Sequence, residues 1–516
     1  MLAITDLVII GTYAVGLFVV AQWVSRSHDG HATNAGDFFL AGRSLPWWAI
    51  GASLIASNIS AEQIIGMSGS GYAIGLAIAS YEWLAAITLL VVGKYFLPVF
   101  LANGIHTMPE FLEQRYDRRV RVLMAFFWVL VYVFVNLTSV LWLGALAINT
   151  VSGLNIELSL AALAFFALAY SSYGGLRAIA LTDTIQVFLL VVGGLFTLSI
   201  MLDLLADGGG AVEGLRVLLA SAPEKFDLIL DREHPHYASL PGLSVLLGGM
   251  WVMHFSYWGF NQYIIQRALG ARSLADAQRG IAFAAFLKVL MPLIVVLPGI
   301  AVYTMGMPLS SADEAYPTAI NLLPVGLKGL VIAALLAAIV SSLASMANSI
   351  STLVTLDLLP VIRNDLSTTS QLRTGRLAGC LAMLVAALSA RPLLGSFDQA
   401  FQYIQEFTGF FTPGIVVIFL LGVFWHRASA AGALAAALVS VSLSLALKIL
   451  WPELPFIDRV GLVFLVALAI ALSLGKRTDT ADTPRVAEVS FATGADYKVA
   501  SVMITSVIAL IYATWW

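Results

Sequence analysis

Polar residues interrupt a long apolar stretch between Leu45 and Trp83. The interruption runs from Ser57 to Gln63 and reads Ser-Asn-Ile-Ser-Ala-Glu-Gln, and several glycines follow it. An unsatisfied peptide group in hydrocarbon costs several kcal/mol, so irregular backbone inside a membrane is expected only where it lines a cavity or binds a ligand. Freed carbonyls at such a break can ligate a cation, and freed amides or side chains can hold a polar solute. The alternative is a Ser- and Gly-rich packing face between close helices.

Ionisable residues lie inside five apolar segments: Glu82, Asp183, His254, Lys288 and Glu406. A charge inside a membrane span is costly and marks a binding site or a pathway by default. Lys288 lies deep in its segment and therefore needs an anionic or carbonyl partner. The others also have structural alternatives. Glu82 would then be interfacial, and Asp183 would cap a helix. His254 would be a hydrogen-bonded core histidine, and Glu406 would face a lysine or backbone groups.

A third polar cluster lies in an Ala-rich segment and consists of Ser341, Ser342, Ser345, Asn348, Ser349 and Ser351. Serines in membrane helices most often bond the carbonyl one turn back and permit close packing. The adjacent pair Ser341 and Ser342 also suits a sodium ion whose other ligands are carbonyls of a broken helix. Both interpretations stay open from spacing alone.

The composition indicates which elements must position these residues. The chain has 516 residues, of which 60% are hydrophobic and 11% charged, and its mean hydropathy is +0.91. A globular domain carries about 25% charged residues, so this composition is typical of a multi-spanning membrane protein. Fourteen apolar segments are long enough to cross a bilayer, at about 20 residues per span. They lie near 4–23, 46–75, 77–101, 120–149, 157–173, 178–204, 242–267, 280–305, 327–358, 376–395, 398–425, 428–450, 458–475 and 498–516.

Lysine and arginine are much more frequent in the loops that follow the odd-numbered segments than in the loops on the opposite side. We assign Arg267 to one of these lysine- and arginine-rich loops. By the positive-inside rule these loops are cytoplasmic. We therefore expect a multi-pass protein of the cell (inner) membrane with both termini outside. The long acidic loop 205–241 is then external.

A second interrupted segment suggests internal symmetry. Gly248 and Gly249 precede a polar run that includes His254 and Asn261, five spans after the first interruption. Two broken helices an odd number of spans apart have opposite orientations, as in two inverted five-helix repeats. We predict a first peripheral helix and cytoplasmic loop (1–44), a first repeat (45–204), an external loop (205–241), a second repeat (242–425) and peripheral C-terminal helices (426–516).

Enzyme chemistry finds no support in the sequence. It contains no phosphate-binding glycine loop with a following lysine, no HExxH motif and no hydrolase elbow. Cys380 is the only cysteine, which excludes an intrachain disulfide and a cysteine-based metal cluster. No basic run suggests nucleic acid. Asn136-Leu137-Thr138 matches a glycosylation sequon but lies inside a span, so we take the match as false. We expect no enzyme activity, no organic cofactor and no obligate protein partner. The lipid bilayer is the expected surrounding of the chain.

Five separated stretches carry a resemblance to a known family. They are Trp47 to Trp83 with its NISAEQ and GMSGSGY elements, SSYGGLRAIALTDTIQV (171–187), YWGFNQYIIQR (257–267), AAIVSSLASMANS (337–349) and AFQYIQEFTG (400–409). In order and over nearly the whole chain, they resemble the solute:sodium symporters, particularly the bacterial sodium/sugar branch. The resemblance implies an all-α membrane fold of about fourteen helices with a LeuT-like core of two inverted five-helix repeats.

The resemblance also implies a sugar site. Its polar side chains would be those of Gln63, Glu82, Lys288 and Gln405, with His254 and Ala85 where the galactose-type symporters present Asn and Ser. Tyr257 would stack on the pyranose as the inner gate, backed by Trp258 and Asn261. Met67, Tyr81 and Phe401 would form the outer lid. Such a site is sensible for a sugar, because buried groups built for hydroxyls reject analogues that leave them unpaired.

The implied sodium site combines backbone carbonyls of Ala56, Ile59 and Ala338 with the hydroxyls of Ser341 and Ser342. Asp183 matches an acidic position on the sodium exit path. The resemblance therefore predicts sodium-coupled uptake of a monosaccharide such as galactose or glucose by alternating access. The alternatives are another small polar solute (an inositol, a sialic acid or an amino acid) or, from other classes, a membrane sensor or a passive channel.

Overall fold

The computed structural model describes residues 2–26, 41–171, 176–362, 368–395, 399–475 and 489–516. The loop expected at 27–40 and residues 172–175 of the second family-like stretch lie outside these ranges. The described residues form helices and turns, with one isolated bridge between Leu45 and Ala271. An all-α fold was predicted, and the structure confirms it.

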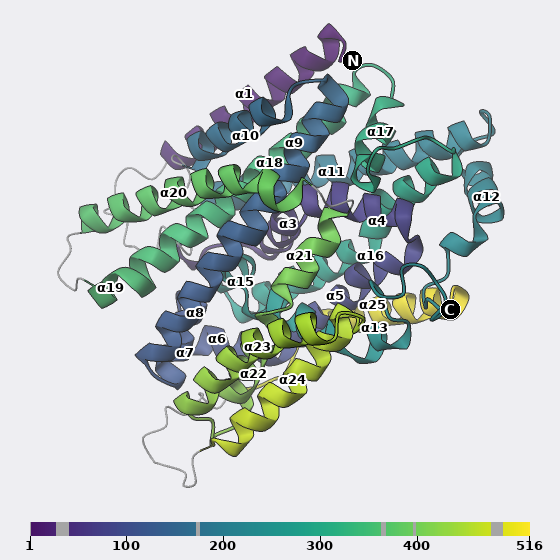
Figure 1. Cartoon of the computed structure of the whole chain (residues 1–516). Helices are drawn as coiled ribbons and strands as arrows, with labels where there is room; N and C mark the ends of the chain where they lie inside the picture. Colours follow the sequence, from purple (N-terminus) through teal and green to yellow (C-terminus); the bar gives the residue numbers. More distant parts are fainter. Residues whose placement is uncertain (1, 27–40, 172–175, 363–367, 396–398, 476–488) are drawn as a thin grey trace.

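The helices form one bundle around a central group of long elements (Figure 1). Their bounds are α1 (Ile4–Arg26), α3 (Trp47–Asn58), α4 (Met67–Ala73), α5 (Ser80–Val91), α6 (Leu97–Ala102), α7 (Met108–Arg115), α8 (Arg118–Val131), α9 (Thr138–Ser152), α10 (Ile156–Ser171), α11 (Leu176–Leu205), α12 (Ala211–Ser221), α13 (Leu243–Leu247), α14 (Gly249–His254), α15 (Gln262–Leu269), α16 (Leu274–Thr304), α17 (Ala315–Asn321), α18 (Leu327–Thr352), α19 (Leu359–Ile362), α20 (Thr368–Leu394), α21 (Ala400–Thr408), α22 (Thr412–Phe424), α23 (Ala430–Leu450), α24 (Phe456–Ser473) and α25 (Ala495–Thr514).

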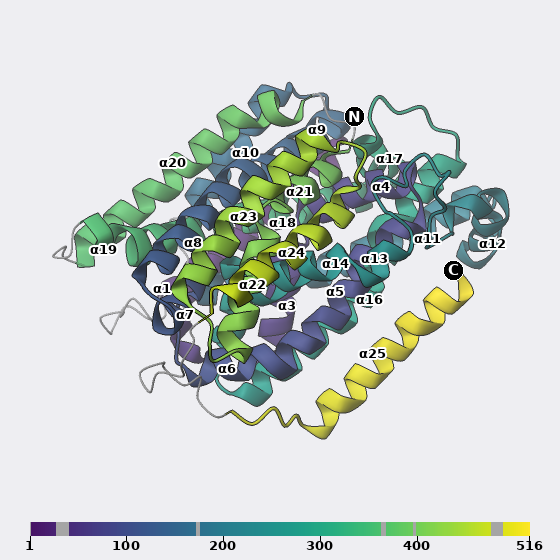
Figure 2. The same cartoon turned by 60° about the horizontal axis from the view of Figure 1, so that its bottom comes forward.

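Nine of the described helical segments are long and apolar enough to cross a membrane, or ten if the bent pair α21 and α22 is one span. The predicted count of fourteen spans therefore stays a prediction, as do the repeat boundaries. Helices α3, α4 and α5 each pack against α16 in the middle of the bundle. Helix α25 lies along one side of it, against α5 and α16 (Figure 2).

The first interrupted segment is broken where the polar residues predict. Helix α3 ends at Asn58, and the chain resumes as a π-helical turn, η2 (Glu62–Gly66), which continues into α4. Between them the Ser60 amide donates to the Asn58 carbonyl at 2.8 Å, outside any α-helical pattern. The Ser60 hydroxyl also accepts from the Glu62 amide at 3.2 Å, so a polar side chain offers the backbone a local alternative to the helix at the break.

The second interrupted segment breaks at a different residue from the one expected. Gly248 lies between α13 and α14, so the two glycines mark the beginning of α14. The interior break follows the π-helical turn η7 (Phe255–Phe260), at Asn261, whose φ of −76° and ψ of 124° are extended. Gly248 and Gly249 therefore predicted the broken segment correctly but not the position of its break.

The loop 205–241 is partly helical. It contains α12, packed on α11, and a short turn that ends at Lys225. The Lys225 ammonium donates to the carbonyls of Tyr72 and Ala73 at 3.0 and 2.8 Å. A cation is stabilised at a helix C-terminus, because the last carbonyls there lack partners. Burial lowers the pKa of this ammonium. The loop is thus fixed to the end of α4, next to the first broken segment.

Candidate solute and sodium sites

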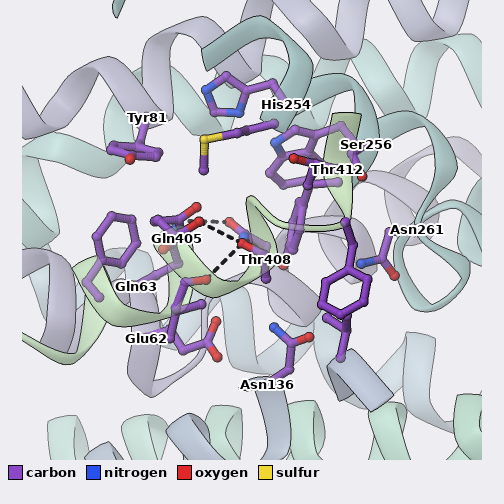
Figure 3. Close-up of a pocket in the computed structure, with 18 of the residues that line it drawn as sticks. Glu62, Gln63, Tyr81, Asn136, His254, Ser256, Asn261, Gln405, Thr408 and Thr412 are labelled. Atoms are coloured by element: carbon purple, nitrogen blue, oxygen red, sulfur yellow. Dashed lines mark hydrogen bonds between the residues drawn. The ribbon is translucent and has the colours of Figure 1, made fainter. Parts of the chain in front are cut away.

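A buried cavity of about 80 Å³ lies between the two broken segments. Figure 3 shows side chains converging on it, with Tyr81 and His254 on one side and Asn136 on the opposite side. The structure brings together at this cavity ten residues of the predicted sugar site and gates: Gln63, Tyr81, Glu82, His254, Tyr257, Trp258, Asn261, Lys288, Phe401 and Gln405. They come from segments up to 342 positions apart in the chain, so only the fold can assemble them.

A fully buried ion pair lies in this cavity wall. Lys288 Nζ is 2.7 Å from Glu82 Oε2, and the two side chains are 0% and 1% exposed. Lys288 also donates to Asn58 Oδ1, and Gln63 donates to the other Glu82 oxygen. The Lys288 ammonium lies 4.8 Å from the centre of the Trp258 ring, within cation–π range. Of the anionic or carbonyl partner predicted for Lys288, the structure shows the anionic one, Glu82, and an interfacial position for Glu82 was wrong.

Hydrogen bonds hold the predicted inner gate in place. Tyr257 Oη accepts a hydrogen bond from Asn58 Nδ2 at 3.2 Å and pairs with Tyr263 Oη at 2.5 Å. Trp258 packs edge-on against the Tyr257 ring, with centroids 5.1 Å apart. Asn261, at the break, accepts from Tyr132 Oη. Tyr257 is thus tied to the break of α3 on one side and to α15 on the other.

The opposite wall contains aromatic rings and unused polar atoms. The Tyr81 ring packs edge-on against Phe401 at 5.1 Å and against His254 at 6.1 Å. Within the described part of the chain, neither Tyr81 Oη nor His254 Nε2 has a hydrogen-bond partner. Both atoms are therefore available to a polar solute. Met67 is fully buried but does not line the cavity, so the structure does not place it with Tyr81 and Phe401.

Sequence reasoning missed Glu62 and Asn136 as cavity residues. Glu62 is 8% exposed and accepts from Ser139 Oγ at 2.9 Å. Asn136 belongs to a π-helical turn, Tyr132–Leu137, and lines the cavity opposite Tyr81. A signal was present for both residues, because each is polar inside an apolar segment. Glu62 was noted only as part of the first break, and Asn136 only as a false sequon.

The predicted sodium ligands lie on two helices that pack together. Helix α18 carries Ser341 and Ser342 and contacts α3, which ends at the break that holds Ile59. Ser342 Oγ is fully buried and has no hydrogen-bond partner in the described structure. Ser341 Oγ instead donates to Asp183 at 2.6 Å. The two adjacent hydroxyls are thus in different states, and the Ser342 hydroxyl is the one free to take a ligand.

Asp183 lies in a buried polar network and caps no helix. It is 0% exposed and also accepts from Ser53 Oγ at 2.6 Å. Arg267 reaches the same network, donating to Ser53 Oγ at 3.3 Å and to Ser345 Oγ at 2.9 Å. Arg267 is 1% exposed, so its assignment to a cytoplasmic loop was wrong. A buried carboxylate needs a compensating charge, and Arg267 supplies it from α15.

Glu406 belongs to a separate ion-pair cluster. It lies 2.7 Å from Lys448 Nζ and 2.9 Å from an Arg459 guanidinium nitrogen. It does not line the cavity. The structural alternative, in which Glu406 faces a lysine, is therefore the correct one.

A helical membrane bundle with two broken helices around a buried polar cavity is the architecture of a secondary transporter. The chain belongs to the sodium:solute symporter family, whose model matches residues 38–440. Membership of this family means that sodium is the coupling ion of the class and that the protein is located in a membrane.

Individual relatives agree with this assignment. The chain is 46% identical to a sodium/glucose cotransporter of Vibrio parahaemolyticus, over 100% of this chain and 99% of that one. It is 32% identical to a sodium/myo-inositol cotransporter of Homo sapiens, over 84% of this chain and 64% of that one. A solved structure of a Na⁺-coupled sialic acid symporter, in a substrate-bound outward-open state, superposes with a TM-score of 0.79. At 22% identity, with 91% of this chain and 97% of that chain covered, this similarity supports the inverted-repeat fold.

Proposed function

We propose that the protein couples inward sodium flow to the uptake of a monosaccharide, glucose or galactose, by alternating access. The buried network of Glu82, Lys288, Gln63 and Asn58 carries this proposal. It presents charged and amide groups at the depth where the two helices break. A sugar offers only hydroxyl donors and acceptors, which these groups can pair. The name of the Vibrio relative supports the same solute class.

The site residues have distinct proposed roles. Gln63, Glu82, His254, Lys288 and Gln405 would bond sugar hydroxyls, and Tyr257 would stack on the ring, backed by Trp258 and Asn261. Tyr81 and Phe401 would close the other side, and Met67 would support this lid from behind. Ser342, Ser341 and the carbonyls of Ala56, Ile59 and Ala338 would hold sodium. Asp183 would lie on the sodium exit path. The family consists of transporters, and we infer that the solute passes chemically unchanged.

The driving force is sufficient for concentrative uptake. A membrane potential of about 100 mV contributes about 2.3 kcal/mol per charge. A tenfold sodium gradient adds about 1.4 kcal/mol. One sodium per sugar then sustains a sugar gradient of roughly several hundredfold. This direction of transport fits a protein of the inner membrane with cytoplasmic loops after the odd-numbered spans and external termini.

Uptake into proteoliposomes tests the proposal. The purified protein would be reconstituted, and glucose, galactose and myo-inositol uptake compared with and without an inward sodium gradient. We expect accumulation of a hexose only with sodium. Accumulation of myo-inositol alone would indicate that the solute is an inositol, as the name of the second relative states for that protein. Equal uptake of all three without sodium would indicate a passive channel and overturn the proposal.

A further inference from the structure

A second cavity, of about 270 Å³, lies between the peripheral helix α1 and helices α9, α10, α11 and α18. Figure 1 shows α1 and α10 beside each other on the outside of α18. This cavity shares no lining residue with the solute cavity. Its wall is almost entirely apolar and includes Ile10, Ile148, Leu163 and Leu336. Phe166, which lines the cavity, is 42% exposed on the apolar helix α10. The cavity is therefore accessible from the bilayer and unsuited to a sugar.

Two polar atoms in this wall lack partners. Gln186 is 1% exposed, and its Oε1 atom has no hydrogen bond within the described structure. Tyr13 Oη, on α1, is likewise buried and unpaired. Both residues line the cavity. Unpaired buried polar groups are costly, so their presence in an apolar cavity points to a ligand that pairs with them.

We propose that this cavity binds a membrane-borne alcohol, an apolar molecule that ends in one hydroxyl group. The hydroxyl would donate to Gln186 Oε1 and accept from Tyr13 Oη, while the apolar body fills the space between α1 and α18. A lipid acyl chain would leave both atoms unpaired. A carboxylate would face an amide oxygen that repels it, one helical turn from Asp183 on the same helix. A water molecule would find only these two polar partners and would leave the apolar remainder of the cavity empty.

A ligand in this second cavity would contact helix α18 next to the proposed sodium site. Ala337 and Val340 line the cavity, and each directly precedes a residue of the proposed sodium site, Ala338 and Ser341. An occupant would therefore pack against the turns of α18 that carry those ligands. It would also connect α1 to the core, where α1 already contacts α18 and α11.

Photolabelling of the full chain in lipid nanodiscs tests the proposal. The probe is dodecanol that carries a diazirine, and the matched probe is the same alkane without the hydroxyl. We expect dodecanol adducts on α1 or α18, at least about fivefold above the alkane and displaced by excess dodecanol. Gln186→Leu should reduce alcohol labelling about fivefold without reducing alkane labelling, since it removes the acceptor. Gln278→Leu is the matched control, because Gln278 is buried on α16 and bonds the Gly93 carbonyl.

Three results would overturn the proposal. Equal labelling by alcohol and alkane would indicate a lipid-tail groove. Stronger displacement by dodecanoic acid than by dodecanol would indicate an acid site. Absence of adducts here would show that the cavity binds neither. If Gln186→Leu does not fold, Tyr13→Phe and the cavity-filling Ala333→Phe can replace it in the labelling test. Both variants should lower labelling by the alcohol. Labelling needs no sodium, sugar or transport, so its failure is distinct from failure of the proposed function.

Discussion

Lys288 Nζ and Glu82 Oε2 lie 2.7 Å apart, and neither side chain is exposed beyond 1%. The pair joins α16 to α5 across the floor of the solute cavity, and Asn58 and Gln63 complete it from the first broken segment. Removing one member of a buried pair costs more than the pair contributes, because the remaining charge has no partner. Three of these four groups, Lys288, Glu82 and Gln63, are also proposed sugar ligands, so stability and binding are coupled here.

Replacement of Lys288 by Ala should destabilise the protein by about 3–5 kcal/mol and abolish sugar uptake. The physical reason is the Glu82 carboxylate left buried and unpaired. Thermal unfolding in detergent and sodium-driven uptake would measure both effects. Lys448→Ala is the control, because Lys448 pairs with Glu406 at a 38% exposed position. It should cost at most about 1 kcal/mol. Normal uptake by Lys288→Ala would remove this residue from the sugar site.

Replacement of Gln63 by Ala should abolish uptake with little loss of stability. Glu82 keeps Lys288 as its partner in this variant, so no charge is left unpaired. The measurement is sugar binding by equilibrium dialysis alongside thermal unfolding. Gln278→Ala, far from the cavity, should leave sugar binding intact. Unchanged sugar affinity in Gln63→Ala would contradict the proposed hydroxyl contact.

Replacement of Ser342 by Ala should raise the half-saturating sodium concentration by about tenfold or more, since a free oxygen ligand is lost. Sodium-dependent uptake over a range of sodium concentrations measures this. Ser349→Ala is a matched control on the same helix, because Ser349 is also buried and unpaired within the described residues but lies two turns further along. The sodium assignment fails if both variants behave like the original protein.

Arg267 and Asp183 should show strong coupling. Arg267→Ala leaves the Asp183 carboxylate without its cation and should destabilise the protein by about 3–5 kcal/mol. Asp183→Asn in the same chain should restore much of that stability, because the amide still bonds Ser53 and Ser341. A double-mutant cycle of unfolding free energies gives the coupling. Additive effects would show that the two charges act independently.

His254→Asn should shift the preference between glucose and galactose by about 5-fold to 100-fold, the value of one hydrogen bond gained or lost in a buried site. His254 Nε2 is unpaired beside Tyr81, so the amide would present a different donor to the solute. Competition of each sugar against the other in proteoliposomes gives the ratio. Phe255→Leu is the control, because Phe255 is the next residue along the chain and its ring lines a different, apolar cavity. This variant should leave the glucose-to-galactose ratio unchanged. An identical ratio in His254→Asn would exclude His254 from specificity.

The sequence by itself determined the all-helical membrane fold, the break near Ser57 to Gln63 and the need of Lys288 for an anionic or carbonyl partner. These conclusions were accessible because a polar group at membrane depth can be recognised from the apolar residues around it in the sequence, and such a group is costly unless it is paired or lines a cavity. The motifs also named ten residues that line the cavity, but they included Met67, which does not line it, and left out other lining residues such as Glu62 and Asn136.

Only the tertiary structure decided which groups meet. Arg267 lies inside the bundle, in the same hydrogen-bond network as Asp183. The Ser341 hydroxyl bonds Asp183, whereas the Ser342 hydroxyl has no partner within the described residues. The second break lies at Asn261. Each of these depends on contacts between helices far apart in the sequence, such as α11 with α18 and α15 with α3. Hydropathy and spacing describe one helix at a time, whereas the partner of a buried group is set by the packing of its neighbours.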